Sequence, residues 1–441
     1  MKRYSFIFCL LFLLFPLIPN AENTKASEKW TLKECLDYAL EHNIQVKKSK
    51  VSILSADEDL KLAKAQLFPS LSASSSQNYS NYPSSRVENS NSYTGSYGLN
   101  ANLKLFDGGR RLQTIKQQNL QTQVNQLNLE QSEDDIRIAL IQAYMQTLYA
   151  YEAVEINKNT VEVSKVQLDR STELFRAGSI SKVDLSQFES QYSTDVYQLV
   201  IAEKNLANYK LQLKQLLELN IDEEIELDIP QLETADILSP LPDKETLYAT
   251  ALAVMPEIKN SLLNVQLSEI EIKKAKAGYL PSLSLSAGIG TGHSSGTGIT
   301  FKDQVWDRFS ESVGLTLSIP IFSNRENKTA VNKAKLAVTT NQLELLNTQK
   351  NLLKTVEGIY LDASSSQTQY IAAEDRLKAV QESFRQTEEQ FFLGMKNTLE
   401  LLTEKSNLLN AKQEILQAKY MAIMSIQLLN VYQKKEIDDK L

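Results

Sequence analysis

The chain of 441 residues contains few cysteines and histidines, two of each. Cys9 lies in an apolar N-terminal segment that we expect to be removed, which leaves Cys35 alone and excludes an internal disulfide. His42 and His293 are too far apart for the i, i+4 spacing of a metal-binding pair. We therefore expect Cys35 to be a structural thiol on an apolar helix face, and the protein to bind no metal or other cofactor.

Enzyme motifs are absent as well. The chain contains no G-x-S-x-G nucleophile turn, no phosphate-binding P-loop and no C-x-x-C pair. Asp and Glu outnumber Lys and Arg by 54 to 47, and the basic residues form no strong cluster of the kind that binds nucleic acid. The sequence thus argues against an enzyme and against a nucleic-acid partner.

Glycine and proline are scarce, at 14 and 10 residues, and unevenly spread. Neither occurs in the ranges 110–177, 179–229 and 395–441, where Gln, Asn, Leu, Lys, Glu and Ala dominate. This composition indicates long helices. A helix of ~70 residues would be ~100 Å long, which exceeds any globular core and favours coiled-coil packing.

Long apolar segments are also absent after residue 21, where none reaches the ~18 residues of a transmembrane helix. Before that point, Lys2 and Arg3 precede the apolar run FIFCLLFLLFPLI, and the sequence PNA ends at Ala21. The pattern predicts a secretory signal peptide over 1–21 that is cleaved near Ala21; a retained N-terminal anchor is the alternative. Because no cysteine follows the apolar run directly, we expect no lipid anchor.

What the chain does contain is a repeat. KAQLFPSLSAS at 64–74 recurs as KAGYLPSLSLS at 276–286, and ELFRAGSISKVDL at 173–185 recurs as EQFFLGMKNTLEL at 389–401. The order of the landmarks is the same in both halves, and the two offsets differ by only four residues. We infer a tandem duplication of about 215 residues.

The repeat organises the expected elements. We predict a signal peptide over 1–21, a first repeat over 22–230, a linker over 220–246, a second repeat over 243–433 and a C-terminal tail over 434–441. The first repeat is expected to contain a helix over 31–67 with a Thr31–Glu34 capping box, strands over 69–80 and 93–106, and long helices over 108–177 and 180–219. The second is expected to contain a helix over 243–279 that Pro256 could interrupt, strands over 281–291 and 311–322, and long helices over 324–393 and 396–433.

The expected strands alternate strictly. In 93–105 the odd positions are Tyr, Gly, Leu or Ala, whereas the even positions are Ser, Thr, Asn, Gly or Lys. The ranges 281–289 and 312–321 alternate in the same way. A membrane β-barrel shows this pattern, with lipid outside and water inside; a soluble β-sandwich is the alternative. In the barrel, Pro69 and Pro281 would mark where a helix ends and the chain enters the membrane.

Four strands cannot close a barrel, because the smallest known barrels have eight. An open sheet edge in a bilayer would leave backbone groups unpaired. Several copies must therefore combine their strands: two copies would supply eight and three would supply twelve. Only the larger barrel would leave a water-filled lumen.

The sequence LKLFDGGRR at 103–111 combines a strand end with a helix start. Gly108 and Gly109 permit a sharp corner, and Asp107 can cap the following helix. In the second copy, Ser323 and Asn324 are turn and cap residues too.

These motifs together resemble the TolC-like outer membrane efflux protein family. The resemblance rests on the paired K-A-x-x-x-PSLS, on LFDGGR and on L-F-x-x-G-x-x-x-x-x-D-L at 174–185 with its looser copy, and it extends over about 30–433. It implies a mixed α and β fold, mostly helical, built from two tandem repeats. The assembly would be a homotrimer with a twelve-stranded outer-membrane β-barrel, four strands per protomer, continued by a long α-helical coiled-coil barrel in the periplasm.

The function that the resemblance implies is a passive exit duct. It would lie in the outer membrane of a Gram-negative-type bacterium, in contact with lipid, and extend into the periplasm. Its partners would be a periplasmic adaptor protein and an inner-membrane transporter of the RND, ABC or MFS type, which supplies the energy. The linker 220–246 would join the belt around the middle of the helices. The cargo is open: tripartite efflux is our first hypothesis, and type I protein secretion is the alternative.

Gly178 and Gly394 occupy equivalent positions between a very long helix and its successor, as C-cap glycines do. The resemblance implies that these turns form a periplasmic tip where the adaptor docks and the channel closes. The exposed residues there would be Arg176, Ser179, Ser181, Met395, Lys396, Asn397 and Thr398.

The resemblance also implies a pore constriction. Glu400 would face the lumen, so that three copies form an acidic ring; a solvated surface glutamate is the alternative. A second acidic position of the family is Thr403 here, and Glu404 would point elsewhere. Asp184 matches the acidic residue of the first repeat to which a family tyrosine donates a hydrogen bond, but Phe391 occupies the tyrosine's position.

A rival from another class is a periplasmic coiled-coil scaffold or the adaptor itself. An adaptor would show a lipoyl-type β domain between two hairpin helices, and the sequence shows none.

Overall fold

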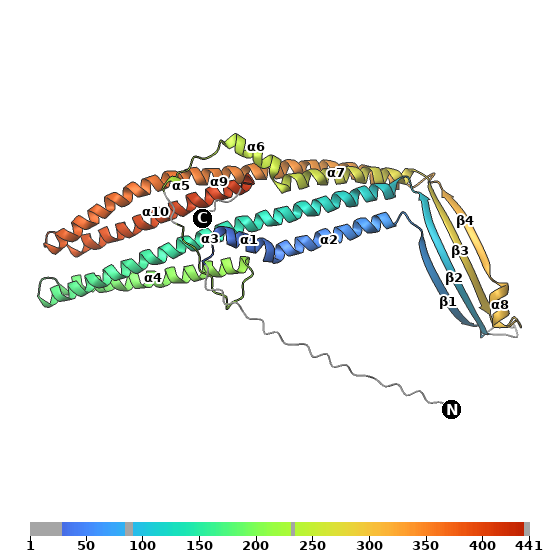
Figure 1. Cartoon of the computed structure of the whole chain (residues 1–441), viewed down its shortest axis with the longest axis horizontal. Helices are drawn as coiled ribbons and strands as arrows, with labels where there is room; N and C mark the ends of the chain where they lie inside the picture. The colour runs from blue at the N-terminus through green and yellow to red at the C-terminus, as the bar shows by residue number, and fades with distance from the viewer. Residues whose placement is uncertain (1–28, 84–90, 231–233, 436–441) are drawn as a thin grey trace, which may run out of the picture.

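The structure is a computed structural model that describes residues 29–83, 91–230 and 234–435. The signal peptide expected over 1–21 and the tail beyond residue 435 lie outside the described residues. The molecule is elongated, with a β-sheet at one end and helices along the rest of its length (Figure 1).

The elements of the first repeat are α1 (Leu32–His42), α2 (Ile44–Ala65), β1 (Ser70–Asn81), β2 (Asn91–Phe106), α3 (Arg110–Arg176) and α4 (Lys182–Leu216). The linker holds α5 (Thr234–Ile237), and the second repeat consists of α6 (Lys244–Val254), α7 (Pro256–Lys276), a 3-10 turn (Ala277–Tyr279), β3 (Ser282–Ser294), α8 (Phe301–Asp307), β4 (Ser310–Ser318), α9 (Glu326–Phe392) and α10 (Thr398–Tyr432).

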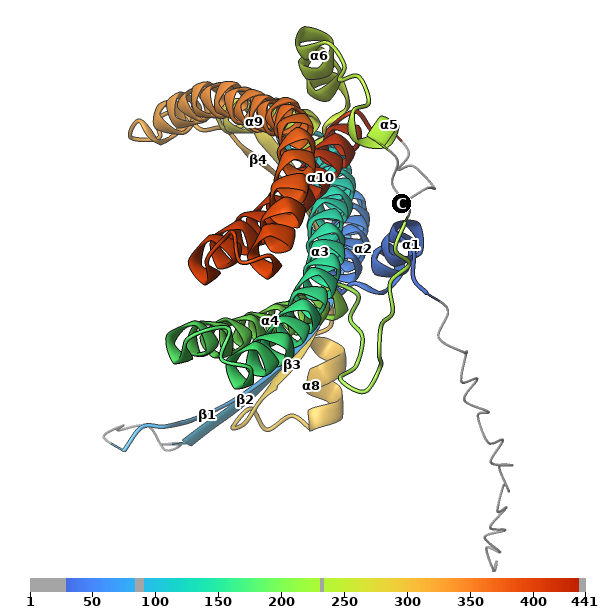
Figure 2. The ribbon, with the colours of Figure 1, turned by 90° about the vertical axis from the view of Figure 1, so that its left-hand side faces the viewer.

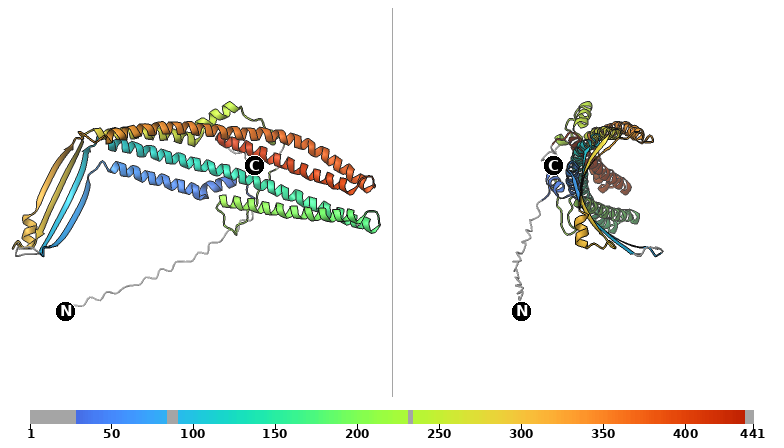
Figure 3. Two further views of the ribbon diagram at one scale, coloured as in Figure 1. Left: turned by 180° about the vertical axis from the view of Figure 1, so that it is seen from behind. Right: turned by 90° about the vertical axis from the view of Figure 1, so that its right-hand side faces the viewer.

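Two long helices form the frame of the molecule. α3 and α9 have 67 residues each, so each is ~100 Å long at 1.5 Å per residue. α2 and α4 follow one another along α3, and α7 and α10 follow one another along α9 (Figures 1 and 3). Viewed along the long axis, the helices form a curved layer with α1, α5 and α6 on its convex side (Figure 2). No described helix is both long and apolar enough to cross a membrane.

The first helix of each repeat is broken at the same relative place. The second copy is interrupted at Met255, and α7 begins at the next residue, Pro256. The first copy was expected to be continuous over 31–67, but it ends at His42 and restarts at Ile44. Asn43 causes this break with an extended backbone: its buried side chain accepts a hydrogen bond from the Gln45 amide (2.8 Å) and donates one to the Leu216 carbonyl (3.1 Å). Such local bonding competes with helix continuation.

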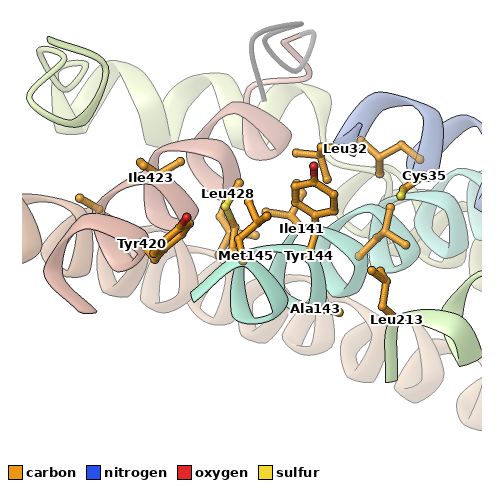
Figure 4. Close-up of a cluster of buried hydrophobic side chains, with 14 of the residues drawn as sticks. Leu32, Cys35, Ile141, Ala143, Tyr144, Met145, Leu213, Tyr420, Ile423 and Leu428 are labelled. Carbon is orange, nitrogen blue, oxygen red and sulfur yellow. The ribbon is translucent and has the colours of Figure 1, made fainter. Parts of the chain in front are cut away.

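The N-terminal cap of α1 is as predicted. The Thr31 hydroxyl accepts a bond from the Glu34 amide, and the Glu34 carboxylate accepts one from the Thr31 amide at 2.9 Å. Cys35 follows on the buried face of α1, in the central apolar cluster with Leu32, Tyr144 and Leu213 (Figure 4). Burial, with a smaller contribution from Glu34, raises the pKa of the thiol to about 12. The expectation of a buried structural thiol is confirmed.

The four strands form one antiparallel sheet in the order β1-β2-β3-β4. The pairing of β2 with β3 joins the two repeats, and its register sets Leu99 opposite Ile289 and Leu103 opposite Leu285. Since alternate residues share a face, the apolar odd-numbered positions line up as rows across one side of the sheet. β1 and β4 are the edge strands of this sheet.

Two strand ends differ by three or more residues from those expected, and the other strand boundaries by at most two. β4 ends at Ser318 rather than at 322, because Pro320 has no N–H to donate to the neighbouring strand. β3 continues to Ser294, beyond the expected 291, and the following loop contains the helix α8, which the sequence did not predict. β1 and β3 each begin one residue after a proline, Pro69 or Pro281, as the helix-to-strand switch requires.

Left-handed backbone forms the corners between strand and long helix. Gly108 and Gly109 have φ of 70° and 81°, and a Cβ on Gly108 would lie 2.8 Å from the Ala277 carbonyl oxygen. The N-cap residue is Gly109, but the Asp107 carboxylate caps the first turn as expected: it accepts a bond from the Arg111 amide and pairs with the Arg111 guanidinium, both at 3.3 Å.

The second corner follows the same rule without glycine. Asn324 and Arg325 take the left-handed conformation, with φ of 43° and 68°, and Arg325 is the N-cap of α9. Ser323 accepts a bond from the Glu326 amide through its backbone carbonyl, at 2.7 Å. Ser323 and Asn324 lie in the turn as expected, but the expectation that they cap the helix with a side chain was wrong.

Candidate functional site

The two helical hairpins α3–α4 and α9–α10 turn at the end of the molecule that lies opposite the sheet (Figure 1). Gly178 and Gly394 have the same left-handed φ of 74°. The amide after each glycine bonds back to the preceding helix: Ser179 to the Leu174 carbonyl at 2.8 Å, and Met395 to the Gln390 carbonyl at 2.9 Å. This is the Schellman arrangement, which the two glycines predicted.

The residues around these turns differ in exposure. Met395 is 71% exposed, and Leu393 just before Gly394 is 74% exposed. Lys396 is half-buried. Thr398, expected to be exposed, is buried, so that expectation was wrong. The remaining residues of the expected tip are exposed: Arg176, Gly178, Ser179, Ser181, Gly394 and Asn397.

Asp184 and Glu400 have the same structural role in the two repeats. Each is the third residue of its helix and completes a capping box. The Asp184 carboxylate accepts bonds from the Ser181 hydroxyl (2.6 Å) and amide (3.1 Å). The Glu400 carboxylate accepts a bond from the Asn397 amide at 3.0 Å. Such carboxylates also interact favourably with the positive end of the helix dipole.

The two carboxylates differ in their second partner. Thr398, at the start of α10, donates a hydrogen bond from its hydroxyl to Asp184 at 2.8 Å, which ties the second repeat to the first. Glu400 pairs instead with Lys396, one turn away in its own chain segment. The pKa of Asp184 is lowered by the Ser181 and Thr398 bonds, and that of Glu400 by Lys396 and the Asn397 amide.

Phe391 lies in an apolar contact rather than in a polar one. Its ring packs edge-on against Phe188, with 5.8 Å between ring centroids, in a cluster that includes fully buried Leu401. A tyrosine hydroxyl is therefore not what holds Asp184 in this chain; the Thr398 hydroxyl is its cross-repeat donor. Sequence reasoning missed this pair, since Thr398 corresponds to Lys182 in the first repeat and no repeat signal links it to Asp184.

A second cross-repeat contact lies deeper in the bundle. The Lys405 ammonium of α10 lies 2.8 Å from the Asp195 carboxylate of α4, and their side chains are only 6% and 3% exposed. The Ser164 hydroxyl of α3 contacts both groups, and Gln191 donates to the other Asp195 oxygen at 2.8 Å. A buried ion pair with this many partners keeps its charges satisfied.

Two further contacts join the hairpins on the α3–α9 side. Gln167 of α3 donates to Glu388 of α9 at 3.1 Å. The Arg170 guanidinium lies over the Phe392 ring, 3.3 Å from its centroid, in the cation–π arrangement. The hairpins of the two repeats are thus connected by polar, ionic and aromatic contacts.

Thr403 and Glu404 occupy different sides of α10. Thr403 is exposed, and its hydroxyl donates back to the Leu399 carbonyl at 2.7 Å. Glu404 accepts a bond from the Ser383 hydroxyl of α9 at 3.0 Å, so it faces the neighbouring helix. Thr403 therefore stands where the resemblance implies a second acidic residue, and its hydroxyl bonds to the backbone of its own helix.

Comparison with known proteins gives a family match and similar relatives. The family described as "Outer membrane efflux protein" matches residues 35–218 and 247–430. The outer membrane protein TolC of Escherichia coli (strain K12) is 25% identical over 407 residues, which cover 89% of this chain and 80% of TolC. The proteases secretion protein PrtF of Dickeya chrysanthemi is 22% identical over 409 residues, covering 88% of this chain and 85% of PrtF.

A solved structure has the same fold. The crystal structure of the CmeC outer membrane channel of Campylobacter jejuni superposes with a TM-score of 0.75 at 22% identity, covering 93% of this chain and 87% of CmeC. The family match spans both repeats and stops only at the linker and the ends. The repeated helix–hairpin–helix architecture and the two equivalent tips are thus those of a known family, and this chain belongs to the outer membrane efflux proteins.

Proposed function

We propose that the protein is the outer-membrane duct of a tripartite efflux pump, through which substrates leave passively. The observation that carries this proposal is the division of one chain into a sheet with an apolar face and two helical hairpins that end together at the opposite pole. The family consists of exit channels for efflux or secretion and not of enzymes. The inner-membrane partner would supply the energy.

The working form would be a homotrimer. β1 and β4 are edge strands of 12 and 9 residues, and their outer backbone groups need partners in a bilayer. Joining β4 of one protomer to β1 of the next would give a barrel of twelve strands. The curved helical layer of one protomer (Figure 2) would form one third of a tunnel wall. The barrel would cross the outer membrane and the tunnel would extend into the periplasm.

The cross-repeat contacts would act as a gate. For a tunnel to open at the tips, α4 and α10 must move apart, and this movement breaks the Thr398–Asp184 bond and the Lys405–Asp195 pair. Glu400 of three protomers would form a single acidic ring that attracts cations. Thr403 supplies no charge for a second ring, and Phe391 contributes packing rather than a hydrogen bond to the closed state.

The tips would be the docking surface for the periplasmic adaptor. The two turns are exposed and lie beside one another at the pole opposite the sheet (Figure 3). The adaptor would contact Arg176, Gly178, Ser179 and Ser181 on one turn and Gly394, Met395, Lys396 and Asn397 on the other. The inner-membrane transporter would be of the RND, ABC or MFS type.

Protein secretion is the second candidate, because PrtF is a secretion protein with similar coverage. Complementation separates the two candidates. The chain is expressed in cells that lack their own duct, together with either a drug-efflux pump or a protease-secretion transporter. Restored drug resistance without restored protease export supports efflux; the reverse result supports secretion. Failure in both, with the protein recovered from the periplasm without detergent, would support a soluble scaffold and refute the channel.

A further inference from the structure

The loop between β3 and β4 contains α8, at the end of the sheet farthest from the long helices (Figure 1). Thr300 caps this helix: its hydroxyl oxygen accepts a bond from the Asp303 amide at 3.3 Å. Gln304, only 6% exposed, fastens the helix to its surroundings. Its side chain accepts a bond from the Ser294 amide (2.7 Å) and donates one to the Ile299 carbonyl (2.8 Å). α8 is therefore held in a definite place.

That place is the apolar face of the sheet. Thr291 and His293 continue the odd-numbered row of β3 that includes Leu285 and Ile289, and alternate residues of a strand share a face. The Thr291 hydroxyl donates to the Val305 carbonyl of α8, and the His293 ring packs edge-on against Phe301, with 4.9 Å between centroids. α8 accordingly lies on the convex side of the curved sheet (Figures 2 and 3).

His293 is a buried residue near the end of β3. Its ring stands among Tyr93 and Tyr97 of β2, with centroid separations of 5.3 and 6.0 Å. A Cβ on Gly95 would lie 2.1 Å from this ring, so the glycine opposite His293 is what makes room for it. Aromatic rings thus gather at this end of the apolar face, beneath and beside α8.

The outward side of α8 exposes apolar groups that water does not favour. Trp306 is 83% exposed, and Phe309 just beyond the helix is 53% exposed. Lys302 is also exposed and lies one turn before Trp306, hence on the same side of the helix. Gln304 points towards the sheet from the opposite side. Tryptophan with a neighbouring lysine is the combination found where the lipid headgroups meet the acyl chains.

We propose that α8 is a membrane-interface helix, with Trp306 inserted at the headgroup boundary of the outer leaflet. The occupant of this surface is lipid, because the exposed side of α8 continues the apolar face on which Val313 and Leu315 are 80% and 64% exposed. Lys302 keeps the helix at a shallow depth, where its ammonium reaches the phosphates. The inference rests on the proposed function, in which that face of the sheet meets the bilayer.

The chain offers a direct test because it contains only two tryptophans, Trp30 and Trp306. Trp30 lies in the central belt, where its amide donates to the Glu226 carbonyl at 2.8 Å. The Trp30→Phe variant therefore reports Trp306 fluorescence alone. The full chain is reconstituted in phospholipid vesicles with and without lipids that carry bromine near the headgroup end or near the middle of the acyl chain.

We expect the bromine nearer the headgroup to quench Trp306 more strongly than the deeper bromine, with little quenching by iodide in the water. Strong iodide quenching and no bromolipid quenching would overturn the proposal. Should the Trp30→Phe variant not fold, the difference in fluorescence between the unaltered chain and the Trp306→Phe variant supplies the same measurement.

A second reporter distinguishes this inference from the proposed function. The variant with Trp30→Phe, Trp306→Phe and Leu315→Trp places its only tryptophan on the apolar face of β4. Quenching of this reporter by the deeper bromine, with Trp306 unquenched, would refute the interface helix and leave the outer-membrane duct standing. Absence of bromolipid quenching at both positions would refute the membrane placement and, with it, the interface helix.

Discussion

The tips of the two repeats have the same backbone and different chemistry. Both turn at a glycine with φ of 74°, and both continue into a helix whose third residue completes a capping box. Yet Asp184 accepts a bond from the opposite repeat, whereas Glu400 pairs with its neighbour Lys396. The duplication thus left two helix caps of the same kind, in which one carboxylate links the repeats and the other pairs within its own segment.

The largest expected effect comes from the buried pair that joins the repeats. Lys405→Met leaves the Asp195 charge buried without its partner, and we expect a loss of about 3–5 kcal/mol in stability. In a reconstituted channel the same variant should raise the closed-state conductance. Thermal unfolding followed by circular dichroism and planar-bilayer recording measure the two effects.

A matched control exists on the same helix. Lys419 of α10 pairs with Glu152 at 2.9 Å, but their side chains are 20% and 29% exposed, so Lys419→Met should cost about 1 kcal/mol or less. The double variant Lys405→Met with Asp195→Leu should recover most of the lost stability. Equal losses for Lys405→Met and Lys419→Met would contradict the assigned importance of the buried pair.

The bond between the tips can be removed without disturbing either cap. Thr398→Val deletes the hydroxyl that donates to Asp184 at 2.8 Å, which should cost about 1 kcal/mol. We expect this variant and Asp184→Ala to raise the closed-state conductance, whereas Glu400→Ala should chiefly weaken block by multivalent cations. Ser181→Ala, which removes part of the cap alone, is the control. If Ser181→Ala leaks as much as Thr398→Val, the cross-repeat bond is not the gate.

The equality of the two turns can be tested by adding one methyl group to each. Gly178 and Gly394 have the same φ, and a Cβ on either would meet no described atom within 4 Å. Alanine at each position should therefore lower the stability only by the cost of a left-handed alanine backbone, roughly 1–2 kcal/mol. This loss should be the same in both variants. Unequal losses of melting temperature in the two variants would show that the turns are not equivalent in the assembled protein.

The smallest expected effect is that of mildly acidic pH. The pKa values of Asp184 and Glu400 are lowered from their ordinary values of 3.8 and 4.5. A carboxyl group with a lowered pKa in the folded state stabilises that state above its ordinary pKa, and the stabilisation is lost as pH falls through the folded value. Conductance should thus hardly change between neutral pH and pH 5 and should rise below 3.8. A rise centred near pH 6 would exclude these carboxylates as its cause.

Much of this architecture was readable from the sequence because it follows from local preference. The glycines at 178 and 394, the prolines at 69 and 281 and the alternating odd positions each act on their immediate neighbours. The helix break at Asn43 was not predicted, because it depends on the Leu216 carbonyl from a distant segment. The left-handed Arg325 was missed for a related reason, since arginine rarely adopts that conformation unless the surrounding chain requires it.

The candidate site likewise contains residues that the sequence predicted and residues that it did not. The carboxylates Asp184 and Glu400 could be found through the repeat, because both copies keep an acidic residue three positions after a cap. The partners Thr398 and Lys405 could not, since each lies more than 200 residues from the group it contacts and a residue of another type, Lys182 or Glu189, stands at the corresponding position of the first repeat. The sequence around Lys405 does not indicate that its side chain is buried, because the burial depends on residues from other segments.

The sequence by itself determined the duplication, the approximate places of the long helices and strands and the glycine turns at 178 and 394, because these arise from covalent geometry and from the period of apolar residues along one segment. Only the tertiary structure decided which charges are buried together, which carboxylate links the repeats and on which face of the sheet α8 lies. These depend on side chains from separate segments meeting in space, where burial and hydrogen bonding change the energy of a residue far more than its neighbours in the chain do.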